Sequence, residues 1–172
     1  MAIIRSVCGH TPCIAPSAFV AENATIVGNV IIGEQSSIWY HAVLRGDVNR
    51  ITIGDRSNIQ DGCIVHGTYQ THETVVGNHV TVGHGAILHG CFIGSGCLIG
   101  MGSIVMDGVE LGEYCLVAAG SLLTEGKKFP SKTLIVGRPA SVKRFLTNDE
   151  IEMLHQSSQN YLMYMQWYQH RV

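Results

Sequence analysis

Aliphatic residues recur at nearly every sixth position between residues 14 and 123, and a glycine often follows them. This spacing is too regular for chance in ordinary sequence. A repeat this short cannot bury an apolar face alone, so successive copies must coil and stack on one another. The pattern therefore predicts a parallel β-helix, in which the aliphatic side chains point inward and small residues permit tight corners.

The predicted coils place the inward residues in three columns. Three repeats make one coil of about eighteen residues, and stacked coils lie ~4.8 Å apart, as neighbouring strands do. The first column is Ile14, Ile32, Ile53, Val76, Ile93 and Leu111; the second is Val20, Ile38, Ile59, Val82, Ile99 and Val117; the third is Ile26, Leu44, Val65, Leu88, Val105 and Leu123.

The six-residue rhythm breaks in three places, with three extra residues in 44–53, five extra in 65–76 and one missing in 88–93. Insertions in a coil of this kind become loops on one face, and that face is often where the protein functions. We therefore expect loops at the first two breaks.

After Leu123 the pattern stops, and residues 125–130 and 137–139 are interpreted as turns leading away from the coil. A capping box stands at 147–150, and apolar residues then recur at three- or four-residue intervals. We expect a helix over 147–172 that lies along the coil and covers an apolar side. Residues 1–146, the β-helix with its return segment, and this helix form one domain.

Composition narrows the range of partners. The 172 residues are 46% hydrophobic and 14% charged, enough apolar material for a sizeable core. A net charge of −2 without runs of like charge argues against nucleic acid or membrane binding, so we expect a small-molecule substrate or protein contacts. The start of the chain carries no export signal, and the six cysteines form no Cys-x-x-Cys pair. We expect a cytoplasmic protein with buried thiols.

The register singles out two histidines. His66 follows Val65 and His89 follows Leu88, so they occupy the same place in one column on successive coils. Their backbones should lie ~4.8 Å apart with parallel side chains. That separation suits two imidazoles sharing one zinc ion at Zn–N distances of ~2.0–2.1 Å.

A third histidine belongs to the adjacent column. The segment between His84 and His89 can span ~16 Å, so His84 should not reach the same metal within its own chain. A neighbouring subunit must supply it, and a three-fold axis along the coil does so in the simplest closed way. The remaining histidines outside the inserted loop are interpreted as surface or capping residues: His10, His41, His79, His155 and His170.

The segments around these histidines resemble the signature of the gamma-class carbonic anhydrase family. The matching stretches are Arg45-Gly46-Asp47, Asn58-Ile59-Gln60-Asp61, His66, Gly83-His84 and Leu88-His89-Gly90-Cys91. The resemblance implies an all-β, left-handed parallel β-helix that forms homotrimers, with zinc, iron or cobalt at the subunit interfaces. It also implies that a metal-bound hydroxide attacks carbon dioxide, with His66 and His89 from one chain and His84 from the next.

The resemblance implies roles for five further residues. Arg45, stacked one coil below His66, would pair with Asp47 across the subunit interface. A direct catalytic role and a purely structural ion pair are equal alternatives for these two residues. Gln60 resembles the glutamine that hydrogen-bonds the metal-bound hydroxide, and Asp61 would orient ligands or the interface, although either can be simple corner polarity. Tyr161, on the predicted helix, could reach over the site or pack in the core.

The sequence departs from the family pattern in its loop. Val48 stands where the archetypal enzyme has an extra glutamate, and the inserted loop, 67–74, is short with one acid. His72 or Glu73 could replace the missing proton shuttle. This short-loop form resembles the branch found with phenylacetate and carnitine pathway proteins, which is associated with hydratase or thioester hydrolysis.

Three functions stay open. The leading one is a zinc-dependent hydratase acting on carbon dioxide, or by the same chemistry a thioesterase. The second is a coenzyme A-dependent hexapeptide acyltransferase, which shares the coil and uses one histidine as a general base. The third is a metal-stapled trimer with little activity, in which the metal stabilises the assembly.

Overall fold

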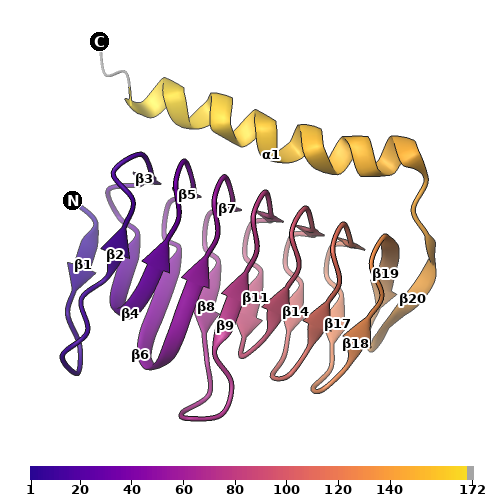
Figure 1. Cartoon of the computed structure of the whole chain (residues 1–172), viewed down its shortest axis with the longest axis horizontal. Helices are drawn as coiled ribbons and strands as arrows, with labels where there is room; N and C mark the ends of the chain where they lie inside the picture. The colour runs from indigo at the N-terminus through magenta and orange to yellow at the C-terminus, as the bar shows by residue number, and fades with distance from the viewer. Residues whose placement is uncertain (170–172) are drawn as a thin grey trace.

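The computed structural model describes residues 1–169. Short strands wind into a left-handed parallel β-helix, and one long helix, α1 (Asn148–Gln169), lies alongside it. Figure 1 shows the coils stacked along the longest axis of the molecule, with α1 running back over them towards the N-terminal end. The predicted fold class is confirmed. His170 and the rest of the predicted helix beyond Gln169 lie outside the described residues.

The coils present three faces of stacked parallel strands. The first face holds β2 (Cys13–Ile14), the ends of β4 (Thr25–Ile32) and β6 (Val43–Ile53), β9 (Thr74–Val76), β12 (Phe92–Ile93), β15 (Glu110–Leu111) and β18 (Lys128–Phe129). The second holds β3 (Phe19–Val20), β5 (Ser37–Ile38), β7 (Asn58–Ile59), β10 (Thr81–Val82), β13 (Leu98–Ile99), β16 (Leu116–Val117), β19 (Thr133–Gly137) and the antiparallel edge strand β20 (Ala140–Phe145). The third holds β1 (Ile3–Arg5), the starts of β4 and β6, β8 (Ile64–His66), β11 (Ile87–His89), β14 (Ile104–Val105) and β17 (Leu122–Leu123).

The three predicted columns are confirmed by the strand register. In the second column Ile59 lies directly beside Val82, and in the third Val65 lies directly beside Leu88. All four side chains are fully shielded from solvent. Burying an aliphatic side chain of this size contributes ~1.5–3 kcal/mol to folding, so the columns form the core of the molecule.

The expectation that the coil ends after Leu123 is wrong. The six-residue spacing continues to Phe129 and Ile135, which are buried and extend the first and second columns. The charged and proline residues around Phe129 suggested a turn, but only the inward residue of each repeat has to be apolar. Lys128 points outward and forms an ion pair at 2.9 Å with Glu110 of the preceding coil.

The two predicted insertions take different forms. Residues 67–73 leave the coil as a loop between β8 and β9, as expected, and Thr68 bridges to His72 within it. The expectation of a loop in 44–53 is wrong, because β6 runs around the corner as one strand beside β4. Gly28 and Gly46 lie together at this corner, where a Cβ on either would collide with neighbouring backbone.

The helix begins with the predicted capping box. The backbone N–H of Thr147 donates to Oε2 of Glu150 at 2.9 Å, and the N–H of Glu150 donates to Oγ1 of Thr147 at 3.3 Å. One side of α1 packs on the second face, where Leu154, Ser158 and Met165 are buried. The helix therefore covers an apolar side of the coil, as the sequence predicted.

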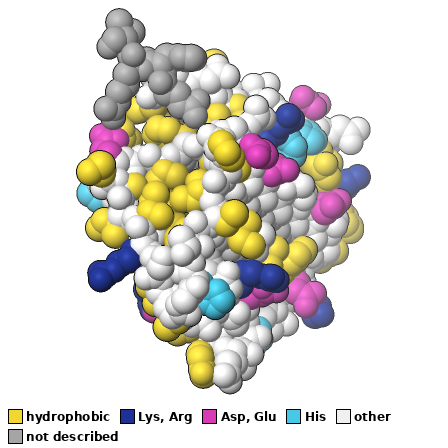
Figure 2. All heavy atoms as spheres, turned by 60° about the vertical axis from the view of Figure 1, so that its left-hand side comes forward, with side chains coloured by type: hydrophobic (Ala, Val, Ile, Leu, Met, Phe, Trp, Pro, Cys, Tyr) yellow, Lys and Arg dark blue, Asp and Glu magenta, His cyan; other side chains and the backbone are white. Residues whose placement is uncertain are grey.

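The mixed surface charges and the burial of four cysteines agree with what the sequence predicted, but two other cysteines are exposed. Figure 2 shows acidic and basic side chains interspersed on the face in view. Burial raises the pKa of the Cys91 thiol to about 12 and that of Cys63 to about 11. Cys97 and Cys115 are also buried, whereas the thiols of Cys8 and Cys13 are exposed, contrary to expectation. Within residues 1–169, no helix is both long enough and apolar enough to span a bilayer.

Candidate metal centre

His66 and His89 stack on neighbouring coils of the third face. They end strands β8 and β11, pair directly in register, and hold their ring centroids 5.1 Å apart. The predicted register of the two histidines is confirmed, but their rings are tilted by 56° rather than parallel. Arg45, one coil earlier in the same column, brings its guanidinium Nη2 to 3.5 Å from Nδ1 of His66, at the outer limit of a hydrogen bond.

The two imidazoles turn one nitrogen each towards the other. Nδ1 of His66 lies 3.1 Å from Nε2 of His89. The second nitrogen of each ring meets a carboxylate, at 3.0 Å for His66 with Asp47 and at 2.6 Å for His89 with Asp107. Because an ionised carboxylate can only accept, these outer nitrogens carry the ring protons. In the neutral rings both facing nitrogens therefore present lone pairs, which repel unless a cation is shared between them.

This separation fits a shared metal ion. Two nitrogens, each ~2.0–2.1 Å from a tetrahedral Zn²⁺, lie ~3.3 Å from one another. A carboxylate on the far nitrogen is the arrangement that orients metal-binding histidines and raises their basicity. The side chains of His66 and His89 are 14% and 38% exposed, so a group from outside the chain can reach them.

Asp107 is a functional candidate that the sequence reasoning missed. It lies two residues after Val105, on the coil that follows His89, and its carboxylate also accepts a hydrogen bond from Thr68 at 2.6 Å. Burial by itself would raise the pKa of Asp107, but the hydrogen bonds from Thr68 and His89 hold it below the ordinary value. Following the third column one coil further would have placed this acid beside the histidine.

Gly90 leaves room for that contact. Its φ is +59°, a conformation that residues with a side chain rarely adopt. A Cβ at this position would also collide with the carboxylate of Asp107 and lie 2.8 Å from the Cβ of His72. The residue after His89 therefore has to be glycine for the acid to reach the imidazole.

Arg45 and Asp47 pair within one chain. Nη1 of Arg45 donates to Oδ2 of Asp47 at 2.5 Å, whereas the resemblance implied a pair across a subunit interface. Burial would raise the pKa of Asp47, but hydrogen bonds from His66 and Arg45 lower it below its usual value. Asp47 is therefore an ionised acceptor for the ring proton of His66 at neutral pH.

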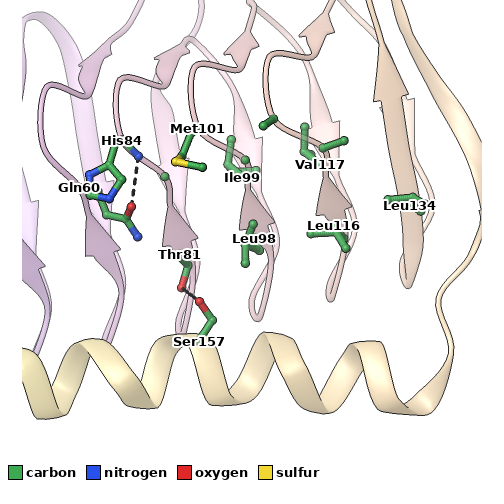
Figure 3. A pocket seen from close by; sticks show the side chains of 14 residues that line it. Gln60, Thr81, His84, Leu98, Ile99, Met101, Leu116, Val117, Leu134 and Ser157 are labelled. Carbon is green, nitrogen blue, oxygen red and sulfur yellow. Dashed lines mark hydrogen bonds between the residues drawn. The ribbon is translucent and has the colours of Figure 1, made fainter.

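Gln60, Asp61 and His84 gather at a corner of the second face. Nδ1 of His84 lies 2.8 Å from Oδ2 of Asp61. The backbone N–H of His84 donates to Oε1 of Gln60 at 3.1 Å, the contact drawn in Figure 3. The amide nitrogen of Gln60 donates to Oδ1 of Asn58 at 3.1 Å. These two hydrogen bonds hold the carboxamide of Gln60 at both ends, and the residue is only 5% exposed.

Tyr161 reaches the same corner from α1. It lines a cavity of about 220 Å³ together with Asp61, and its ring meets that of Trp39 edge-on at 5.5 Å. Burial, helped by the negative charge of Asp61, raises the pKa of Tyr161 to about 12. The phenol therefore stays protonated at neutral pH.

The site residues thus form two clusters within one chain. We call the first the paired-histidine cluster: Arg45, Asp47, His66, His89 and Asp107. We call the second the Gln60 cluster: Gln60, Asp61, His84 and Tyr161. No group of three or more His, Cys, Asp or Glu within residues 1–169 is arranged to hold a metal ion, so His84 does not join the other two histidines inside one chain.

The loop of residues 67–73 carries the two candidates for proton transfer. Glu73 is held by Arg50, whose Nε donates to it at 2.9 Å. His72 packs beside Gly90, and its charge when protonated would lower the pKa of Asp107. Of the two, His72 is therefore the one that neighbours the paired-histidine cluster.

A groove of about 390 Å³ leads away from the Gln60 cluster along the second face (Figure 3). It starts at His84 and passes Leu98, Leu116 and Leu134 on successive coils. On the helix side, the hydroxyls of Ser157 and Thr81 hydrogen-bond at 3.2 Å. The groove is mainly aliphatic, so the apolar part of a ligand fits there.

Models of hexapeptide-repeat families match the coil. The model "Bacterial transferase hexapeptide (six repeats)" matches residues 90–125, and "Hexapeptide repeat of succinyl-transferase" matches residues 73–105. A solved structure, that of a hexapeptide transferase family protein from Anaplasma phagocytophilum, is 45% identical with a TM-score of 0.93 and covers 96% of this chain and 98% of that one. The fold is therefore that of the hexapeptide-repeat proteins.

Curated relatives define the family more narrowly. A carbonic anhydrase of Geobacillus kaustophilus is 48% identical over 160 residues, which cover 93% of this chain and 87% of the relative. Gamma carbonic anhydrase 1, mitochondrial, of Arabidopsis thaliana is 42% identical over 92% of this chain, although the chain spans only 59% of that relative's length. The chain belongs to the gamma-class carbonic anhydrase family.

Proposed function

We propose that the protein is a metal-dependent hydratase acting on carbon dioxide. Zinc would be held by His66 and His89 of one subunit and by His84 of the next in a homotrimer; iron or cobalt also suits imidazole ligands. The observation that carries this proposal is the pair of facing nitrogens, 3.1 Å apart, with the outer nitrogen of each ring fixed by a carboxylate. Relatives named carbonic anhydrase support the reaction.

An apolar ridge beside the paired-histidine cluster supports the assembly. The outward residues of β8, β11, β14 and β17 stack in register, and they are Ile64, Ile87, Ile104 and Leu122. Ile64 is 45% exposed in the single chain. A continuous apolar ridge next to an incomplete site is the surface expected at a subunit interface.

The two clusters are chemically complementary. The paired-histidine cluster offers two nitrogen ligands and lacks a third. In the Gln60 cluster, Asp61 accepts the Nδ1 proton of His84, which leaves the lone pair on Nε2 for a metal. A subunit that docks on the ridge and presents its Gln60 cluster would complete three neutral ligands.

A metal with three neutral nitrogen ligands supplies the charge that lets a water molecule ionise near pH ~7. Around it, Asp47 and Asp107 hold the imidazoles in the correct tautomer. Gln60 contributes a carboxamide dipole that is already fixed, so it orients a reacting group without reorganisation. His72, at the edge of the paired-histidine cluster, would accept a proton there and pass it to solvent.

The experiment is metal analysis of the purified full chain together with a carbon dioxide hydration assay. We expect bound metal and activity in the natural protein and loss of both in His66→Ala. The control is His10→Ala, an exposed histidine outside the clusters, which should keep both the metal and the activity. Turnover by metal-free protein would contradict the proposal.

The groove beside His84 favours a second candidate substrate, an acyl thioester whose chain lies along Leu98, Leu116 and Leu134. The likeness to a hexapeptide transferase family structure supports acyl-group chemistry of this kind. Thioester hydrolysis that requires His66 would indicate the same metal site with another substrate. Saturable acetyl-CoA binding, with acyl transfer that survives His66→Ala, would indicate an acyltransferase instead.

The remaining alternative is a metal that only staples the trimer. In that case a chelator would dissociate or destabilise the trimer, while the loaded protein turned over neither carbon dioxide nor thioester. Assaying the trimer before and after chelation separates this outcome from catalysis.

A further inference from the structure

Between the coil and α1 lies a cavity of about 220 Å³ whose walls are almost entirely aromatic. Four rings come from the helix, where their spacing puts them on one side: Tyr161, Tyr164, Trp167 and Tyr168. The coil contributes Trp39, Tyr40 and Asp61. No aliphatic side chain and no Lys or Arg of the described residues lines it, which separates this cavity from the aliphatic groove near Leu116.

Several of the lining rings stand at steep angles to one another, and the cavity opens to solvent beside Trp167, which is 65% exposed. Trp39 meets Tyr161 at 81° and Tyr168 at 87°, with centroids 5.5 and 5.3 Å apart. Tyr164 meets Tyr161 at 68°. Near-perpendicular walls expose ring faces in several directions, and an aromatic face carries partial negative charge.

Asp61 adds a full negative charge to this wall. Its Oδ2 is engaged by Nδ1 of His84 at 2.8 Å and its Oδ1 by the backbone N–H of Tyr40 at 3.3 Å. Its negative charge acts on the Tyr161 side of the cavity, and within residues 1–169 no Lys or Arg forms an ion pair with Asp61. The carboxylate therefore attracts a cation, and each of its oxygens already accepts one hydrogen bond.

We propose that this cavity is a binding site for a small quaternary ammonium compound. Such a cation is weakly hydrated, has no N–H to satisfy, and is attracted by several aromatic faces and one carboxylate. A primary ammonium is more strongly hydrated and would lose more hydration on entering an aromatic cavity, and an anion would be repelled. Asp61 and Tyr161 belong both to this cavity and to the Gln60 cluster, but neither is a proposed metal ligand, so the cation should bind whether or not a metal is present.

The chain carries its own reporter for this site. It has two tryptophans, Trp39 and Trp167, and both line the cavity. Titrating the full chain with choline should therefore give a saturable change in intrinsic fluorescence. The uncharged carbon analogue, with a tert-butyl group in place of trimethylammonium, should bind at least about fivefold more weakly, because it lacks the cation–π attraction.

Variants separate the contributions. Asp61→Asn keeps the shape and removes the charge, and should weaken choline binding about fivefold while leaving the analogue unchanged. Tyr164→Leu keeps an apolar wall without a ring, and should weaken choline selectively, whereas Tyr69→Leu, an exposed tyrosine in the loop, should have no effect. His66→Ala removes a proposed metal ligand from the other cluster and should leave choline binding intact, so failure of the metal proposal would be seen separately.

Three results would overturn the proposal: no saturable change with choline, equal affinity for the uncharged analogue, or unchanged choline affinity in Asp61→Asn. The second result would define a plain apolar cavity.

Discussion

Asp107 accepts a hydrogen bond from Nδ1 of His89 at 2.6 Å, although the two residues lie on successive coils. The contact fixes which ring nitrogen of His89 is free to face His66. We predict that Asp107→Asn leaves the fold intact and weakens metal binding ~10–100-fold, the range seen for partners of metal-binding histidines. Competition with a chelator of known affinity measures the change.

The control for this variant is Glu125→Gln, which removes an exposed acid elsewhere on the coil. Metal affinity should be unchanged there. Equal affinities in Asp107→Asn and the natural protein would show that the carboxylate does not orient the imidazole.

Gly90 and Gly102 offer a matched pair for testing the corner after His89. Both have positive φ, +59° and +66°, but only a Cβ on Gly90 would collide with Asp107, since nothing lies within 4 Å of one on Gly102. Gly102→Ala should cost ~1–2 kcal/mol of unfolding free energy through backbone strain alone. Gly90→Ala should cost more and also weaken metal binding. Denaturant unfolding and metal titration give the two readings, and similar costs with intact metal binding in both variants would refute the steric argument.

The apolar ridge predicts how the subunits associate. Ile64→Glu puts a charge at the ridge and should prevent assembly, leaving a species near the chain mass of 18.7 kDa and losing the shared metal. Met153→Glu changes a comparably exposed residue on α1 and should preserve a species of three times that mass. Analytical ultracentrifugation distinguishes the two, and a trimeric Ile64→Glu protein would place the interface elsewhere.

The capping box predicts a pH dependence of stability. The ion pair with Arg144, together with the hydrogen bond from the Thr147 backbone, lowers the pKa of Glu150 from 4.5 to about 2. A lowered pKa in the folded state means that the stabilisation is fully present above the unfolded value and is lost as pH falls towards the folded one. The stability gap between the natural protein and Glu150→Gln should therefore be constant above about pH 5 and narrow between pH 4.5 and 2.

Metal-free protein is required for this measurement, because protonation of histidine ligands releases metal in the same range. Glu152→Gln, an exposed acid on the same helix, is the control and should show no such narrowing. A gap that stays constant down to pH 2 would show that Glu150 is not stabilised by its pairing.

The inward columns and the stacking of His66 over His89 could be read from the sequence, because a six-residue period leaves each side chain one direction to point. The same period also reached Phe129 and Ile135, but the lysines and proline around them suggested turns. The spacing was the stronger constraint there, since outward positions of a coil tolerate any polar residue.

The unbroken course of β6 and the cavity under α1 were decided only by the tertiary structure. Each depends on how a corner bends or on which coil face a helix covers, and periodicity carries no information about either. The sequence by itself determined which residues share a column, because strand pairing at a fixed spacing makes that a matter of counting. Contacts between the helix and the coil, such as Tyr161 with Trp39, needed the three-dimensional packing, because helix placement follows from the sum of many side-chain contacts.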